Sequence, residues 1–144
     1  MKFRVLYVGR GPKWLDAAVG DYVRRMPELE LVRIRDTPNR SCFDRMIRSA
    51  GSSVVVMLDR RGKQLTTKEL ADRYRQWNFG GNDVSFLVGD SEGFSESEIG
   101  QGEFVWSLSP LTYPYSIARL VVCEQLYRAR SIVNGHPYHR YEDC

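Results

Sequence analysis

The sequence predicts one α/β domain, residues 1–144, with a mostly parallel sheet and helices on both of its faces. Residues 53–59 contain an unbroken apolar run, which is typical of a strand covered on both faces, and residues 83–89 are expected to form another buried strand. Segments with helical spacing of apolar residues separate the strand-like runs. With 144 residues and 42% hydrophobic content, the chain can bury one core and has little room for a second.

The N-terminal part predicts a β-α-β unit. Residues 3–8 form a β-rich run that Gly9 closes. Between Pro12 and Pro27, apolar residues recur every three or four positions, and Pro12 suits the first turn of a helix. A second strand is expected over residues 29–34.

The same alternation continues to the C-terminus. Thr66 with Glu69 and Ser95 with Glu98 have the spacing of capping boxes and so predict two helix starts. The remaining predicted elements are a helix at 43–50, strands at 53–59, 83–89 and 104–109, and a long helix from Pro114 through Ile132.

The cysteines and the N-terminus indicate a protein of the cytoplasm. The three cysteines, Cys42, Cys123 and Cys144, are far apart and form no CxxC pair, so neither a disulfide framework nor a cysteine-rich zinc site is expected. After Arg4 the N-terminus reaches charge again at Arg10, far short of the roughly 20 apolar residues of a membrane span, and it lacks a cleavage signal, so no export signal and no membrane anchor are expected.

The net charge of +3 conceals an uneven distribution. Residues 1–50 hold 11 Lys and Arg against 6 Asp and Glu. The arginines there either line a phosphate-facing surface or form an ordinary solvated face. They are Arg24, Arg25, Arg33, Arg35, Arg40, Arg45 and Arg48.

Three strand ends are the expected places for a ligand. In parallel sheets, ligands bind beyond the carboxyl ends of the strands, which directs attention to residues 59–63, 89–93 and 109–114. None of these segments is a P-loop, and no GxGxxG follows a strand, so nucleotide triphosphate hydrolysis and standard dinucleotide binding are disfavoured. The glycines of 89–93 permit a close approach of the backbone to a ligand, although a plain strand-to-helix turn explains them as well.

The C-terminal tail contains both histidines of the chain. His136 and His139 lie among tyrosines and an arginine, which are proton-transfer and stacking residues. Two imidazoles with Cys144 are a weak zinc candidate, and an inert tail is the other alternative.

Residues 84–93 (VSFLVGDSEG), 106–114 (WSLSPLTYP) and 119–140 (RLVVCEQLYRARSIVNGHPYHR) closely resemble the small bacterial large-subunit ribosomal RNA methyltransferase H family of the SPOUT clan. The resemblance implies a C-terminal trefoil knot, a homodimer and S-adenosylmethionine (SAM) as methyl donor. It further implies methylation of N3 of a pseudouridine in large-subunit RNA on assembled ribosomes, with no metal.

The resemblance also suggests roles for individual residues. The cofactor site would comprise Leu58, Gly89, Leu108, Ser109, Pro110, Leu111, Thr112 and Tyr113. The catalytic residues would be Tyr138, His139 and Arg140, which cross toward the partner's site, together with Arg119. Dimer packing is the alternative role for the tail, and a structural salt bridge is the alternative for Arg119.

Two positions depart from the family pattern. Asp90 stands where the family has a second glycine, and Tyr115 stands where it has a histidine. Asp90 and Tyr115, and with them His136 of the tail, are candidates for substrate binding. The departures leave open a methyltransferase acting on a ring nitrogen of a small heterocyclic metabolite, or a non-catalytic RNA- or ribosome-binding module.

Overall fold

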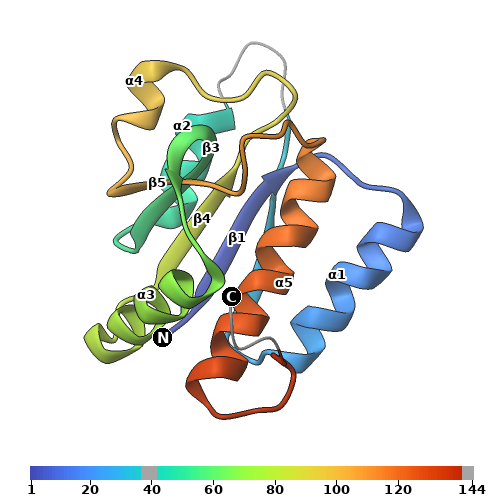
Figure 1. Cartoon of the computed structure of the whole chain (residues 1–144). Coiled ribbons are helices and arrows are strands. Elements are labelled where there is room, and N and C mark those ends of the chain that lie inside the picture. Colours follow the sequence, from blue (N-terminus) through green and yellow to red (C-terminus); the bar gives the residue numbers. More distant parts are fainter. Residues whose placement is uncertain (37–41, 141–144) are drawn as a thin grey trace.

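The computed structural model describes residues 1–36 and 42–140 of the chain. Within these residues, five strands form one parallel sheet in the order β2-β1-β4-β3-β5 (Figure 1). Because all strands run the same way, their carboxyl ends meet at one edge of the sheet. The strands are β1 (Phe3–Val8), β2 (Leu29–Ile34), β3 (Val54–Gln64), β4 (Val84–Val88) and β5 (Phe104–Ser107).

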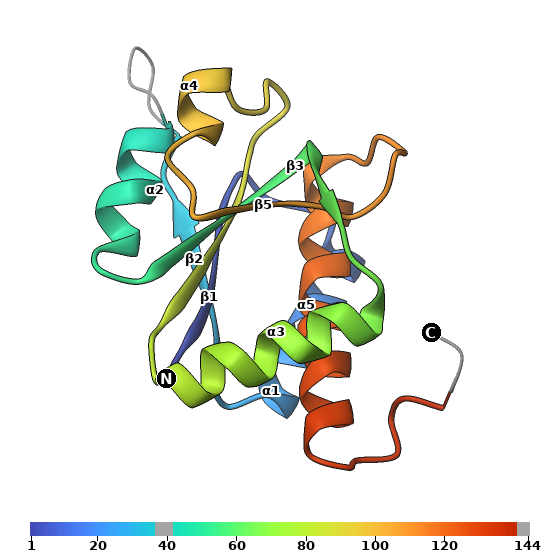
Figure 2. The same cartoon turned by 60° about the vertical axis from the view of Figure 1, so that its left-hand side comes forward.

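Helices cover both faces of the sheet, as predicted. In Figure 2, α1, α3 and α5 lie on one side of the sheet, and α2 and the short α4 lie on the other. Both predicted capping boxes are present, at the starts of α3 and α4. The helices are α1 (Lys13–Arg25), α2 (Cys42–Ala50), α3 (Thr67–Gly80), α4 (Glu96–Ile99) and α5 (Tyr115–Val133).

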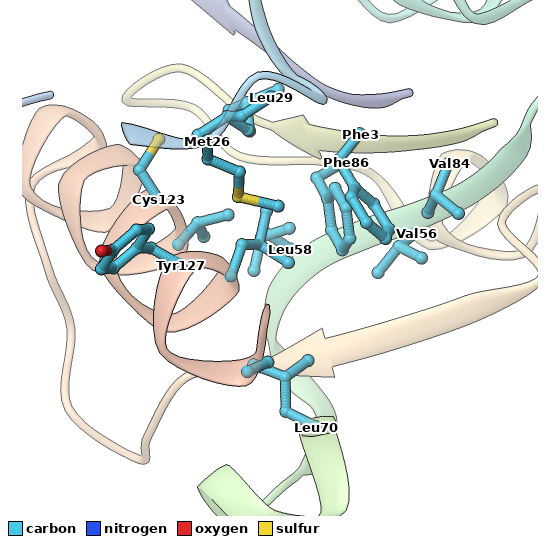
Figure 3. Packing of buried hydrophobic residues seen from close by; sticks show 14 of the residues in the cluster. Phe3, Met26, Leu29, Val56, Leu58, Leu70, Val84, Phe86, Cys123 and Tyr127 are labelled. Carbon is cyan, nitrogen blue, oxygen red and sulfur yellow. The ribbon is translucent and has the colours of Figure 1, made fainter. Parts of the chain in front are cut away.

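Each face of the sheet has its own apolar cluster. On the α1, α3 and α5 side, the rings of Phe3 and Phe86 lie 6.1 Å apart, and Leu58 belongs to the same cluster as Cys123 and Tyr127 of α5 (Figure 3). The other cluster packs α2 onto the sheet. Alternate residues of the central strands enter opposite clusters, which is why residues 54–58 are all apolar and 84–88 are apolar except for the buried Ser85.

Strand β3 is longer than the sequence predicts. It continues through the polar residues after Leu58 as far as Gln64, and its pairing with β5 breaks between Leu58 and Lys63. Gly62 lies in this break, where a Cβ would be 2.5 Å from the main-chain oxygen of Val105. Strand β5 ends at Ser107, two residues earlier than predicted.

No helix in the described part of the chain is both long and apolar enough to span a membrane. The trefoil knot remains an expectation from the family resemblance.

Candidate functional site

A cavity of about 860 Å³ opens at the carboxyl ends of β4 and β5, beside residues 58–61 of β3. This is the edge where the strand-end argument predicts a ligand, and all three predicted segments contribute to it. The lining residues are Leu58, Asp59, Arg60, Arg61, Val88, Gly89, Asp90, Ser91, Glu92, Gly93, Phe94, Trp106, Leu108, Ser109, Leu111, Thr112, Tyr113, Pro114, Tyr115 and Ala118.

One wall of the cavity is the loop between β5 and α5, residues 108–114. Its hydrogen bonds centre on Ser109, whose hydroxyl donates to the hydroxyl of Tyr113 at 2.9 Å and accepts from the N–H of Leu111 at 2.9 Å. The hydroxyl of Ser107 donates to the main-chain oxygen of Ser109 at 3.0 Å. The side chain of Leu111 is left exposed at the cavity.

The opposite wall is the turn after β4, residues 89–94. The carboxylate of Asp90 accepts from the N–H of Glu92 at 2.9 Å, and the carbonyl of Asp90 accepts from the N–H of Gly93 at 3.0 Å. Gly93 has a φ of +70°, which favours glycine. A Cβ at Gly89 would lie 3.2 Å from the ring of Phe94, so the turn packs closely against the end of β4.

The continuation of β3 joins the two walls. Arg60 donates to the hydroxyl of Thr112 at 2.7 Å. Arg61 donates to both carboxylate oxygens of Asp59, at 2.9 and 3.1 Å, and to the main-chain oxygen of Phe94 at 2.6 Å. The hydrogen bond from Arg61 lowers the pKa of Asp59 below its ordinary value.

Most of the predicted cofactor residues line this one cavity. Leu58, Gly89 and the loop residues from Leu108 to Tyr113 do so, except Pro110, which is not among the lining residues. The two departures from the family pattern, Asp90 and Tyr115, line it as well. Their cofactor and substrate roles stay predictions.

Tyr115 also closes the end of β1. A Cβ at Gly9 would lie 3.0 Å from the Tyr115 hydroxyl, and Gly9 has a φ of +81°. The tyrosine therefore fills space that a side chain at position 9 would need.

The sequence reasoning missed several side chains of the cavity. Asp59, Arg60 and Arg61 belong to a segment that the strand-end rule singled out, but none of them was given a role. Phe94 and Trp106, both buried, add aromatic surface to the cavity.

The tail residues do not line the cavity of their own chain. The hydroxyl of Tyr138 donates to Glu124 at 2.7 Å and lies 3.0 Å from that of Tyr22. Burial, followed by these two hydrogen bonds, raises the pKa of Tyr138 well above its ordinary value. Nη1 of Arg128 lies 3.1 Å from Nδ1 of His139; because guanidinium only donates, Nδ1 accepts.

The other tail residues lie at the same end of α5. Nδ1 of His136 accepts from the N–H of Tyr138 at 3.2 Å, and Arg140 is exposed. The described residues hold no group of three or more potential metal ligands, and Cys144 of the weak zinc alternative lies outside them.

Arg119 contacts α1 rather than the cavity. Its side chain is 2% exposed and donates to Asp16, itself 50% exposed, at 2.6 Å. The guanidinium lies 4.2 Å from the centre of the Tyr7 ring, and its Nε is buried with no hydrogen-bond partner among the described residues. These contacts are structural, and the catalytic role of Arg119 stays a prediction.

The N-terminal arginines do not form one cluster. Arg24 and Arg25, in the last turn of α1, both pair with Asp21, whereas Arg33 and Arg35 lie at the carboxyl end of β2. Arg40 lies outside the described residues.

A family model described as "Predicted SPOUT methyltransferase" matches residues 1–139. A ribosomal RNA large subunit methyltransferase H from Methylobacillus flagellatus is 37% identical over 154 residues, which cover 97% of this chain and 99% of the relative. The chain belongs to the SPOUT methyltransferases, in the large subunit methyltransferase H family.

Solved structures show the same fold at low sequence identity. A probable methylase family protein from Haemophilus influenzae is 10% identical to this SPOUT methyltransferase, with a TM-score of 0.64. The match covers 96% of this chain and 70% of the Haemophilus chain. Lpg2936 from Legionella pneumophila, solved with the bound cofactor SAM, has a TM-score of 0.52 and 15% identity, covering 90% and 66%.

Proposed function

We propose that the chain is a SAM-dependent N-methyltransferase that acts on N3 of a pseudouridine in large-subunit ribosomal RNA, in the cytoplasm. The observation that carries this proposal is the cavity of about 860 Å³ at the carboxyl ends of β4 and β5 and residues 58–61 of β3, lined by residues to which the family resemblance gives cofactor roles. The full-length relationship to large-subunit RNA methyltransferases supports the choice of substrate.

The cavity suits SAM. Its volume of about 860 Å³ falls within the range of cofactor sites. Main-chain groups of 108–113 would bind the adenine edge, while Leu58 and Leu111 would cover its faces. The carboxylate of Asp90 provides an acceptor for ribose hydroxyls or a partner for positive charge. When bound, SAM supplies a methyl group on a sulfonium, which is ready for in-line displacement.

The residues of the protein would orient the acceptor and remove the imide proton from N3. Because its raised pKa keeps Tyr138 protonated and its hydroxyl donates to Glu124, Tyr138 is a hydrogen-bond donor rather than a base. We therefore propose that His139 is the base that accepts the N3 proton. Its Nδ1 becomes available once the hydrogen bond with Arg128 is broken. Arg140, exposed beside it, would contact a phosphate or the developing negative charge.

The site is completed by a second copy of the chain. Ala118 lines the cavity near the start of α5, whereas the tail contacts Glu124 and Arg128, about 9 to 15 Å further along the helix axis. A two-fold axis across α5 would bring the tail of one protomer to the cavity of its partner. Ile117, Leu120 and Val121 give α5 a half-buried apolar surface for such packing.

Labelled SAM tests the substrate. Incubation with ribosomes from a methylation-deficient strain is expected to transfer label to large-subunit RNA, at a nucleotide whose N3 becomes methylated. Label in a small-molecule extract instead would support the metabolite enzyme. A folded dimer that binds no SAM in calorimetry would support the non-catalytic module. A protein variant with alanine at both Tyr138 and His139 is expected to lose single-turnover methylation.

Mixed dimers test the two-chain site. Gly89→Val places bulk against Phe94 and is expected to inactivate the cavity, while His139→Ala inactivates the tail. If each site takes its cavity and tail from different protomers, co-refolding the two inactive variants restores up to about a quarter of wild-type activity. If cavity and tail came from one protomer, the mixture would stay inactive, with size-exclusion chromatography as the check that dimers had formed.

A further inference from the structure

We infer that Arg61 and Arg60 are positioning residues that hold the two walls of the donor cavity from the irregular part of β3 between Leu58 and Lys63. This inference rests on the proposed function, because the cavity is taken as the SAM site. The two arginines are adjacent in the chain, yet Arg61 binds the wall at 89–94 and Arg60 binds the wall at 108–113. The spacing of the walls is therefore set by one dipeptide.

Hydrogen bonds with Asp59 fix the orientation of the Arg61 side chain. Its Nε and Nη2 both contact the carboxylate of Asp59, which also accepts from the main-chain N–H of Arg61 at 2.9 Å. The Asp59 side chain is only 11% exposed, whereas that of Arg61 is 50% exposed. A two-point contact to a largely buried carboxylate fixes the plane of the guanidinium and aims Nη2 at the Phe94 carbonyl.

The turn that Arg61 reaches has hydrogen bonds that close mainly on itself. Those of Asp90 with Glu92 and Gly93 shape the turn but do not join it to β3. The bond from Arg61 makes that connection at Phe94, whose ring packs against Gly89 and lies 6.0 Å from the ring of Phe43. Loss of the hydrogen bond from Arg61 would leave the main chain at Phe94 more mobile, while the ring of Phe94 kept its contacts with Gly89 and Phe43.

Arg60 makes the equivalent connection to the other wall, with a weaker attachment. Its hydrogen bond within the described residues goes to the hydroxyl of Thr112, a neutral acceptor, and both residues are exposed. The loop that contains Thr112 is also stabilised by the hydrogen bond between Ser109 and Tyr113. Arg61 should therefore matter more than Arg60 for holding the donor.

Arg60 and Arg61 point to opposite walls because successive side chains of a strand alternate, and both lie where the β3–β5 pairing is interrupted. Regular pairing stops at Leu58 and resumes at Lys63, which leaves the residues between them outside the ladder. Irregularities of this kind redirect side chains near sites. Gly62 permits the close crossing of the two strands, since a Cβ there would collide with the main chain of Val105.

Hydrogen–deuterium exchange of the full-length dimer without donor tests the two contacts directly. We expect Arg61→Gln to speed exchange in 89–94 and not in 108–113, and Arg60→Gln to do the reverse. Arg75→Gln, which removes an exposed ion pair with Asp72 on α3, is the matched control and should change neither segment. Unchanged exchange in 89–94 for Arg61→Gln would overturn the inference, whatever the protein methylates.

Titration with SAM then tests the effect on the donor. We expect Arg61→Gln to weaken SAM binding about tenfold and Arg60→Gln about threefold, because each loses preorganisation of one wall. Arg61→Gln should raise KM for SAM while kcat at saturating SAM stays within about twofold. Arg61→Lys should recover little, since an ammonium cannot make the two-point contact, whereas added guanidinium ion should restore binding to Arg61→Gln.

The two failures can be told apart. Wild-type protein that bound no SAM would overturn the proposed function and the donor role of the arginines together. Wild-type protein that bound SAM, with Arg61→Gln binding equally well, would overturn this inference alone.

Discussion

The hydroxyl of Tyr138 donates to Oε2 of Glu124 at 2.7 Å, which attaches the C-terminal tail to the middle of α5. The Tyr138 ring also lies 4.7 Å from that of Tyr127 and 4.8 Å from the guanidinium of Arg128. Both polar and aromatic contacts therefore hold the tail against α5. Tyr138 is thereby held beside Glu124, Tyr127 and Arg128 of α5.

A double-mutant cycle should detect this attachment. Tyr138→Phe removes the hydroxyl and keeps the ring, and Glu124→Gln removes the charge. We expect a coupling of about 1 kcal/mol in the free energy of unfolding, the usual size for a hydrogen bond of this kind. Urea denaturation of the four proteins measures it. Simple additivity of the two substitutions would show that the contact does not stabilise the fold.

Asp16→Asn should destabilise the protein much more than Asp21→Asn. Asp16 is the carboxylate partner of the almost fully buried Arg119, so its loss leaves a buried cation uncompensated, at a cost of about 2 kcal/mol. Asp21 pairs with Arg24 and Arg25 at the surface, where such pairs contribute about 0.5 kcal/mol or less. Urea denaturation compares the two, and equal losses would contradict the structural role of Arg119.

Gly62→Ala and Gly20→Ala should change stability in opposite directions. A Cβ at Gly62 would lie 2.5 Å from the Val105 oxygen, and because both strands must shift we expect a loss of about 2 kcal/mol or more. At Gly20, within α1, the nearest atom is Arg24 Nη1 at 3.7 Å, so alanine should stabilise by about 0.5 to 1 kcal/mol through helix propensity. Thermal unfolding of both variants measures the signs.

Stability should fall in alkaline solution. Burial raises the pKa of Cys123 to about 12, and burial together with a neighbouring carboxylate raises the pKa of Tyr74 and of Tyr138. In the unfolded chain these groups lose protons near pH 8.5 to 10, roughly their free values, so above about pH 9 the folded state holds more protons than the unfolded state. The free energy of unfolding therefore decreases as pH rises.

Urea midpoints at pH 7.5, 9 and 10 measure this trend. Cys123→Ala should flatten part of the slope even though it lowers stability at every pH. A midpoint that stayed constant from pH 7.5 to pH 10 in the wild-type protein would contradict the prediction.

Alkylation provides a separate test of Cys123. Because its thiol is buried and neutral, iodoacetamide at pH 8 should leave Cys123 unmodified in the folded protein and modify it in urea. Peptide mapping by mass spectrometry locates the label. Rapid labelling of Cys123 in the folded protein would show that α5 is less tightly packed on the sheet than described.

Local sequence signals predicted most of the fold. The capping boxes at Thr66 and Ser95 act within one helical turn, so their sequence alone is informative. β4 and the first half of β3 also gave clear signals, because they are short apolar segments rich in valine and bounded by turn residues, which favours strands over helices. The strand-end rule then located the cavity.

Contacts between distant residues could not be predicted in the same way. Residues 59–64 read as a polar loop and become strand because Lys63 and Gln64 pair with Trp106 and Ser107. The partners of Arg60 and Arg61 lie 52 and 33 residues away. Tyr22 and Tyr138 meet across 116 residues. No local preference encodes such pairs, so the cavity could be located but its supports could not.

The strand order has a consequence for how the chain is made. β1 and β2 are neighbours in sequence and in the sheet, so they can pair while the rest is still being synthesised. β3 lies between β4 and β5, both of which follow it in the chain. A nascent chain therefore carries an apolar strand without either neighbour until Val88 has emerged, and the sheet is complete only after Ser107. During this interval the unpaired edges of β3 are exposed, which favours aggregation of partly folded chains.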